Sequence, residues 1–387
     1  RDDVESRGLG DVYKRQQYYS VDDFGGRLAS MGNKDNSGAK GIGSLAAGVG
    51  ASVQSDGLYK GATATVVGAL NTVAIDTSSN TSAYDGVANS IVGVANATQN
   101  ANATLIFGAG NAVTNSYADV DLNLGNLDLS SPVALSRQLG AAVGTSGGQV
   151  LVIGGANSVD YARFSAVTGV SNTLNGADGN TSDYNFITGA KNTLTNTDST
   201  YVIGSKNTVS DGSSNVVIGD NRKLTSTTGN VVIGSADDEM ETTVSDATIL
   251  GHNANATVAD GVALGSKSVA SVAKGVVGTV PTGTTVSDTD KATATWTSTL
   301  GAISVGDTSK NLTRQITGVA AGTQATDAVN VAQLNAVNTK VDNNAIHFFS
   351  VRGLSSQDNY SNSAATGEKS IAIGASTRTQ GHIGTAL

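Results

Sequence analysis

The sequence predicts an all-β solenoid, a fold in which short strands stack turn upon turn. An apolar triplet followed by glycine recurs along most of the chain, most clearly at residues 201–204, 216–219 and 231–234. Successive repeat glycines lie 14 to 20 residues apart, at positions 154, 169, 189, 204, 219, 234, 251 and 265. A unit this short cannot enclose a core, so each unit must bury its apolar side against its neighbours.

Each part of the repeat predicts a place in one turn. The β-branched triplets favour strands, and we expect the isoleucines of four triplets to face the interior of the stack: Ile153, Ile203, Ile218 and Ile233. Glycine suits the corner that follows, because it accepts a positive φ and lets two backbones approach closely. The four corner glycines are Gly154, Gly204, Gly219 and Gly234. A following asparagine would support the turn by adopting the left-handed region. A β-sandwich of unrelated short strands is the alternative.

The composition favours a thin, repetitive core. The 387 residues include 48 Gly, 2 Pro and no Cys, and 4% are aromatic, so the large side chains that fill most globular cores are scarce. The formal charge of −9 disfavours nucleic acid and anionic membrane surfaces as partners. No apolar run is long enough to predict a membrane-spanning helix. The chain begins with Arg1 and shows no signal-peptide pattern, so we expect an internal fragment.

The repeat pattern divides the chain into seven segments. They are an atypical segment at 1–24, divergent repeats at 25–116, an insertion at 117–148, clear repeats at 149–300, a neck at 301–326, a helix at 327–345 and the start of a second repeat region at 346–387. The insertion contains a Leu/Asp alternation at 120–124, which we interpret as an insertion or as a strand pair that projects from the stack.

Residues 327–345 form the one convincing helix of the sequence. Thr326 is placed to cap the first turn, and Asp327 suits the positive end of the helix dipole. Four apolar residues fall on one face at three- and four-residue steps: Val331, Leu334, Val337 and Val341. An isolated helix of this length is marginal in water. The stripe must therefore pack, either on its own domain or as a coiled-coil seam between chains.

The segment around the start of this helix resembles the neck of trimeric autotransporter adhesins, the Yersinia-adhesin-like surface proteins of bacteria. The motifs are Arg-Gln-Ile at 314–316, Gly-Val-Ala-Ala-Gly-Thr at 318–323 and Asp-Ala-Val-Asn-Val-Ala-Gln-Leu at 327–334. The upstream repeats look like the head of that family. They carry more Val-Val-Ile, however, than the Ser-Ala-Ile-Gly form that is common in the family. Only Lys-Ser-Ile-Ala-Ile-Gly-Ala at 369–375 matches that form well.

The resemblance implies a left-handed parallel β-roll head, a short neck and the start of an α-helical coiled coil, assembled as an obligate homotrimer. The apolar stripe of the helix would then be the trimer seam. It also implies a cell-surface passenger, held in the outer membrane by a C-terminal anchor that this sequence lacks. Such a passenger would bind host extracellular matrix or cell-surface ligands multivalently. A phage-type trimeric fibre is the alternative function.

No motif predicts an enzyme or a cofactor. His252, His347 and His382 lie far apart without metal-like neighbours, and the sequence contains no nucleophile elbow, Walker lysine or zinc-protease string. We therefore expect a shallow binding surface built from corner residues that recur every turn. Five polar corner residues are candidates for ligand contact: Lys191, Lys206, Asn207, Asp220 and Asn221.

Overall fold

The computed structural model describes residues 33, 36–56, 59–77, 84–118, 130–145, 147–343, 356, 365–366, 369–374, 376–380 and 384–386. They belong to two compact units, Arg1–Gln315 and Ile316–Leu387. Four features of the sequence analysis lie outside the described residues: the segment 1–24, the Leu/Asp alternation at 120–124, His347 and His382.

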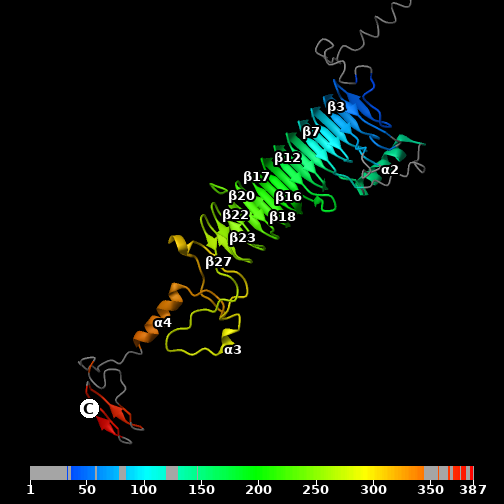
Figure 1. The fold of residues 1–387 in the computed structure, drawn as a ribbon. Coiled ribbons are helices and arrows are strands. Elements are labelled where there is room, and N and C mark those ends of the chain that lie inside the picture. Colours follow the sequence, from blue (N-terminus) through cyan, green and yellow to red (C-terminus); the bar gives the residue numbers. More distant parts are fainter. Residues whose placement is uncertain are drawn as a thin grey trace, which may run out of the picture. The chain divides into compact units, whose positions relative to one another are not determined.

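The first unit is a stack of chain turns that contribute strands to two parallel sheets, and strand order in each sheet follows sequence order (Figure 1). Within the described residues the larger sheet has 13 strands. These are β1 (Leu45–Ala47), β3 (Thr65–Ala69), β5 (Ser90–Val94), β7 (Leu105–Ala109), β9 (Leu151–Gly155), β12 (Ala166–Val170), β15 (Phe186–Ala190), β17 (Tyr201–Ser205), β19 (Val216–Ile218), β21 (Val231–Ile233), β23 (Thr248–Leu250), β25 (Val262–Leu264) and β27 (Ile303–Ser304).

The second sheet has 10 strands in the described part of the chain. They are β2 (Ser52–Val53), β4 (Thr72–Ala74), β6 (Ala97–Gln99), β8 (Ala112–Thr114), β10 (Ser158–Asp160), β13 (Thr173–Asn175), β16 (Thr193–Asp198), β18 (Thr208–Ser213), β20 (Arg222–Thr225) and β22 (Met240–Thr242). Two short parallel pairs add to the stack: β11 (Ala162–Arg163) with β14 (Ser182–Asp183), and β24 (Asn255–Ala256) with β26 (Val269–Ala270). The chain leaves the sheets after β26, passes through the short helix α3 (Asp288–Lys291), returns as β27 and continues into the 3-10 helix η3 (Thr308–Lys310).

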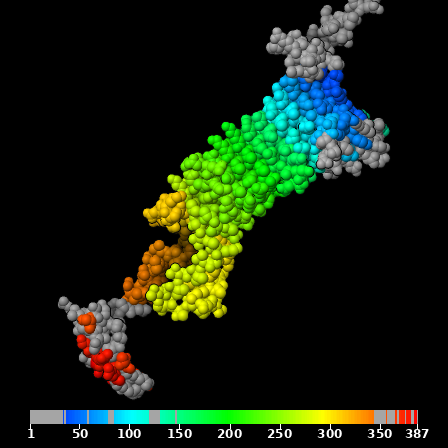
Figure 2. Space-filling view, in the orientation of Figure 1, coloured from blue at the N-terminus to red at the C-terminus, as the bar shows by residue number. Residues whose placement is uncertain are grey.

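Equivalent residues of the repeat lie opposite each other in neighbouring turns. Val202 of β17, for example, pairs with Ile187 of β15 and with Val217 of β19. In Figure 2 the described part of this unit between β3 and β25 forms a continuous body in which the colours follow the order of the sequence. The prediction of a chain dominated by parallel β-structure is confirmed. A β-sandwich is excluded for the described residues, because sandwiches are antiparallel and all strand pairs in both large sheets are parallel.

The isoleucines predicted for the interior of the stack point outward instead. Ile203 is 51% exposed and Ile218 is 37% exposed, and Ile153 and Ile233 are exposed in the same way. The buried residue is instead the valine that precedes each isoleucine: Val152, Val202, Val217 and Val232. Successive side chains of a strand point to opposite faces, so burial of the middle residue turns the first and third outward. A run of three apolar residues does not show which face is buried, and the predicted register was wrong by one residue.

The repeat glycines lie where two turns come close together. Gly204 has a φ of 141°, and a Cβ added there would collide with the carbonyl oxygen of Gly219 in the next turn. Gly154, Gly219 and Gly234 also have positive φ, and each faces the backbone of the equivalent glycine one turn on. Glycine is therefore required here for both conformation and space. The bend itself comes two residues later, where Lys206 adopts the left-handed conformation with φ 57°.

Seven buried asparagines form a ladder along the corner that follows the glycines: Asn71, Asn96, Asn111, Asn157, Asn172, Asn192 and Asn207. From the second member onward, each side-chain Nδ2 donates to Oδ1 of the asparagine one turn earlier, at 2.8–3.0 Å. The same Nδ2 of Asn207 donates to the carbonyl oxygen of Gly219, one turn later, at 2.7 Å. The asparagines thus satisfy buried polar groups between turns. The ladder asparagines do not adopt the left-handed region predicted for the asparagine after the glycine, but Asn221 and Asn253 do, with φ 59° and 54°.

Arg222 takes the place of the next asparagine and ends the ladder. Its backbone N–H donates to Oδ1 of Asn207 at 3.0 Å. Its guanidinium donates to the carbonyl oxygens of Gly234 and Ala254, each at 2.7 Å, and of Gly251 at 3.1 Å. The side chain is fully buried, and burial lowers the pKa of its guanidinium. Beyond this point the spacing of the repeat glycines changes from 15 to 17 residues. The arginine side chain is longer than that of asparagine, so it reaches carbonyl groups that an asparagine would leave unpaired.

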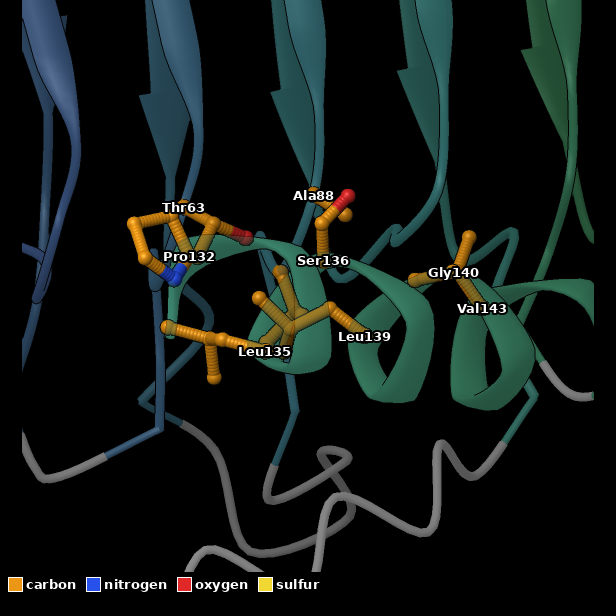
Figure 3. A pocket seen from close by; sticks show the side chains of 9 residues that line it. Thr63, Ala88, Pro132, Leu135, Ser136, Leu139, Gly140 and Val143 are labelled. Carbon is orange, nitrogen blue, oxygen red and sulfur yellow. The ribbon is translucent and has the colours of Figure 1, made fainter. Parts of the chain in front are cut away.

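The insertion after β8 contains a second substantial helix, α2 (Pro132–Thr145), which the sequence analysis did not predict. Ser131 caps it, because its Oγ accepts the N–H of Ala134 at 3.1 Å, and Pro132 fits the first helical position. Gly140 and Gly144 obscure this helix in the sequence, because glycine is a poor helix former. Leu135 and Leu139 line an apolar groove of about 470 Å³ between the helix and the edge of the stack (Figure 3).

Asp85 provides a pH-dependent contribution to the stability of the early turns. Its side chain is fully buried, and burial raises the pKa of its carboxyl from 3.8 to about 6. Between about pH 4 and 6 the unfolded chain loses this proton while the folded chain keeps it, so stability falls as the pH rises through this window. We expect a loss on the order of 2 kcal/mol between pH 4 and 7.

The variant Asp85→Asn should abolish that loss in denaturant titrations at the two pH values. Asp238→Asn, which removes an equal charge from an exposed loop, serves as the control and should leave the pH dependence unchanged. An unaltered pH dependence in Asp85→Asn would contradict this assignment.

The second unit contains the helix α4 (Val331–Asn343) and a short parallel pair, β28 (Ile371–Ala372) with β29 (Thr385–Ala386). The helix begins four residues later than predicted, because Asn330 caps it in place of Thr326. Oδ1 of Asn330 accepts the N–H of Gln333 at 3.0 Å, and Oε1 of Gln333 accepts the N–H of Asn330 at 3.2 Å. This reciprocal pair is a capping box. Asp327 instead accepts the N–H groups of Thr323 and Gln324 at 2.9 Å, which hold the pKa of its carboxyl below its usual value.

Candidate functional site

The outward side of the 13-stranded sheet is mostly apolar, with threonine or serine at positions 65, 90, 168, 188 and 248, and we refer to it as the apolar sheet face. It consists of the first and third residues of the strands, none of which is charged. Its exposed large side chains are Leu45, Val67, Leu105, Phe107, Ile153, Phe186, Tyr201, Ile203, Ile218, Val231, Ile233, Leu250, Leu264 and Ile303.

The outward side of the 10-stranded sheet has the opposite character. Its outward positions are mostly threonine and serine, with charged residues such as Asp160, Lys223 and Glu241. Lys223 and Glu241 also form an ion pair, with Nζ and Oε1 3.3 Å apart. A sheet with one solvated face normally carries polar residues there. The 10-stranded sheet follows that rule, and the apolar sheet face does not.

Side chains on the apolar sheet face also contact each other from turn to turn. The rings of Phe186 and Tyr201 stack with their centroids 5.3 Å apart and an angle of 6° between their planes. Because equivalent strands pair in register, such contacts repeat along the stack. A continuous apolar surface of this extent is rare on a soluble monomer and marks an interaction surface.

The helix α4 presents a second unpartnered apolar surface. Val331, Leu334, Val337 and Val341 are all more than half exposed, and α4 has no buried residue among those described. Leu334, for example, is 54% exposed. The structure therefore places the four predicted seam residues on an exposed stripe, and the alternative in which this helix packs on its own domain finds no support in the described contacts.

The five predicted ligand-contact residues separate into different environments. Lys191 and Lys206 are exposed and occupy equivalent corners of neighbouring turns. Asp220 and Asn221 are half-buried and hydrogen-bonded within the stack: the carboxylate accepts the N–H of Ser205 at 2.7 Å, and the amide donates to the carbonyl of Ala236 at 2.8 Å. Asn207 is fully buried in the asparagine ladder, so its assignment to the ligand surface was wrong.

The structure brings no group of three metal-ligating side chains together within the described residues. His252 lies on an exposed corner, with Nε2 3.1 Å from Oδ1 of Asp237, and its Nδ1 is 3.2 Å from the carbonyl of Ser235. None of the helices in the described ranges has the length and hydropathy required to cross a membrane.

Comparison with known proteins finds one family model, which is described as the coiled stalk of trimeric autotransporter adhesins and matches residues 315–353. The chain is also 69% identical over 42 residues to autotransporter adhesin BadA of Bartonella henselae. It is 57% identical over 56 residues to trimeric autotransporter adhesin AtaA of Acinetobacter sp. strain Tol 5. These matches confirm the resemblance to trimeric autotransporter adhesin passengers.

The matched segments are short relative to all the chains involved. They cover 11% and 14% of this chain, and they span only 1% of BadA and 2% of AtaA. The family model bears on residues 315–353, and the role of the stacked turns is inferred from their own surfaces.

Proposed function

We propose that this chain, which carries the coiled-stalk segment of trimeric autotransporter adhesins, is part of an adhesive passenger that works as a homotrimer. The observation that carries the proposal is the apolar sheet face, which no described segment of the chain covers. Three copies of this face, packed against one another, would remove it from water along the whole stack. In this assembly the stacked turns form a left-handed β-roll head.

The two apolar surfaces favour the same partner. The apolar sheet face recurs turn after turn, so a second copy of the chain can match it over its full length, whereas an unrelated partner would need an equally periodic surface. The stripe of α4 is narrow and follows three- and four-residue steps, which suits packing between parallel copies of the same helix. A homotrimer therefore covers both surfaces with one symmetric arrangement.

Leu334→Asp is expected to weaken trimer formation. In the assembled coiled coil the three carboxylates would meet at one level of the seam, where burial of unpaired charge is unfavourable. Sedimentation velocity should show a shift from trimer toward monomer. Asp342→Asn changes a charge on the same helix outside the stripe and should leave the distribution unchanged. A Leu334→Asp variant that stays trimeric at micromolar concentration would show that α4 does not contribute to the seam.

With the apolar sheet face buried between chains, the polar sheet and the corners would face outward and contact the ligand. Lys191 and Lys206 then project from each copy, so a rigid trimer displays three sets of them. Contacts of this kind are individually weak, but three linked copies raise the effective concentration of each. Extracellular matrix proteins or cell-surface molecules of a host are the proposed ligands, and the bacterial surface is the proposed location, with anchoring in the outer membrane by another part of the protein.

The test compares trimeric chain with a monomerised variant, Ile218→Asp, on immobilised collagen, fibronectin and laminin. Avidity should lower the apparent Kd of the trimer by roughly 10²-fold or more for at least one of them. Lys191→Ala together with Lys206→Ala, in the trimeric background, tests the corner contacts separately. Equal affinity of trimer and folded monomer would contradict multivalent adhesion.

A further inference from the structure

A polar cavity of about 360 Å³ opens beside the stack, where residues 117–118 after β8 lie near the loop 178–181 after β13. It lies at the carboxyl ends of three neighbouring strands, β8, β10 and β13. Tyr117 follows the first strand, Tyr161 the second, and Asp178 belongs to the insertion after the third. Insertions into a repetitive scaffold are frequent carriers of binding sites, because they break the uniformity of the surface without disturbing the core.

The insertion that carries Asp178 is held in a fixed conformation. Ala177 and Asn180 exchange two backbone hydrogen bonds, each at 2.9 Å, and Gly179 has a φ of 76° at the third position of this tight turn. A glycine with positive φ at that position is the signature of a type II turn. Asp178 therefore occupies a defined place at the rim of the cavity, although its side chain is exposed.

Arg163 lines the cavity, and its guanidinium is only partly hydrogen-bonded. Its Nε and Nη2 donate to the carboxylate of Asp183, at 3.1 and 2.6 Å, and Nη2 also donates to Oγ1 of Thr181 at 2.9 Å. Within the described residues, Nη1 has no hydrogen-bond partner. The paired edge fixes the guanidinium plane, so the unpaired Nη1 is available as a preorganised donor.

Three further polar side chains of the cavity are unpaired in the described part of the chain, whereas Asn115 and Thr181 are hydrogen-bonded within the stack. Neither phenol hydroxyl, of Tyr117 or of Tyr161, and neither carboxylate oxygen of Asp178 makes a hydrogen bond with another described residue. Burial and the nearby carboxylates of Asp178 and Asp160 raise the pKa of the Tyr161 phenol, so this hydroxyl remains a proton donor. The cavity thus combines free donors, a free acceptor and two aromatic rings.

We propose that this cavity binds a neutral sugar residue of a glycan. Sugar hydroxyls both donate and accept, so neighbouring hydroxyls can accept from Arg163 and Tyr161 while donating to Asp178. The aromatic rings suit the apolar C–H side of a sugar ring, since phenols combine an apolar body with a polar tip. The volume lies at the small end of the range for ligand sites, which fits one sugar residue.

The charges around the cavity exclude the other ligand classes. Asp160, Asp178 and Asp183 outnumber the single Arg163, so acidic sugars and sulfated glycans are repelled. A cationic side chain could pair with Asp178 but would leave Nη1 of Arg163 without an acceptor and facing a like charge. A neutral polyhydroxyl ligand satisfies all of these groups at once.

The inference deepens the proposed adhesive function and rests on it for its biological role, but the cavity is complete within one chain. In a trimer it would occur three times and would remain compatible with multivalent binding. Because β8, β10 and β13 belong to the 10-stranded sheet, the cavity does not involve the apolar sheet face.

The test is saturation-transfer NMR on the full chain with a panel of small probes: methyl β-galactoside, methyl α-mannoside, methyl α-fucoside and N-acetylglucosamine, with N-acetylneuraminic acid and an arginine amide for comparison. At least one neutral sugar should receive saturation. Asp178→Asn should weaken its binding roughly tenfold or more, because a neutral amide oxygen replaces the charged acceptor. Tyr161→Phe, which keeps the ring and removes the hydroxyl, should have a smaller effect. Asp238→Asn, an equal charge change on another exposed loop, should have none.

Binding of none of the neutral sugars, binding only of the acidic or cationic probe, or equal binding by Asp178→Asn and wild type would each overturn the proposal. Sedimentation of the same samples shows whether a failure concerns the cavity or the proposed homotrimer. A trimer that binds no sugar contradicts only the cavity assignment, whereas a monomer that binds sugar contradicts only the assembly.

Discussion

Val217→Asp is expected to destabilise the stack by roughly 3–5 kcal/mol, because it places a carboxylate in the interior without a partner. Val217 is fully buried and lies between Val202 and Val232 in the column of core residues that joins successive turns. The interior is only one side chain thick on each sheet, so a charged group there cannot reach water without separating the sheets. Denaturant titration followed by circular dichroism measures the loss.

The neighbouring position provides the matched control for this measurement. Ile218→Asp introduces the same carboxylate one residue further along β19, where the side chain points outward. Val217→Asp should unfold at a much lower denaturant concentration than Ile218→Asp when both are compared as monomers. Equal stability of the two variants would contradict the observed register and restore the one predicted from the sequence.

Ile218→Asp should instead abolish association of the chains while leaving each chain folded. Ile218 lies in the middle of the apolar sheet face, so a trimer would bring three new carboxylates into a surface that has no charged residue. Each buried, unpaired charge is unfavourable by several kcal/mol, which corresponds to a loss of association of about 10³-fold or more. Sedimentation velocity should show monomer, and circular dichroism should retain the β-sheet signal.

A substitution on the other sheet separates this effect from a general effect of charge. Thr208→Asp adds a carboxylate to the polar outward side of β18, opposite Lys223 of the next strand. It should leave both fold and association unchanged. Loss of association in both variants, or in neither, would show that the apolar sheet face is not the interface.

Much of the architecture follows from the spacing of the repeat glycines. Glycine is required where Gly204 meets Gly219, because any side chain would strike the backbone of the next turn, and this requirement is visible in the sequence as a period. The period predicts stacking and parallel pairing. It does not predict which residue of a Val-Val-Ile triplet faces inward, because all three are apolar. The charge-free first and third positions of the strands are the signal that the outer face is mostly apolar as well.

Other features depend on contacts between distant residues and have weaker signals. The recurrence of asparagine at Asn192 and Asn207 is visible in the sequence. It does not show whether these residues form turns or a buried ladder, because asparagine suits both roles. The sequence alone suggests that Arg222 is exposed, as most arginines are. Its burial depends on carbonyl partners that lie 12 to 32 residues later in the chain. The cavity at Tyr161 combines residues from three turns whose spacing is irregular, so no local motif marks it.

The most direct test of the homotrimer is the mass of the particle in solution, measured by sedimentation equilibrium at micromolar concentration. We expect a particle of three chains, each of 38.6 kDa, because association removes the apolar sheet face and the α4 stripe from water. Sedimentation as a stable, soluble monomer under these conditions would contradict it.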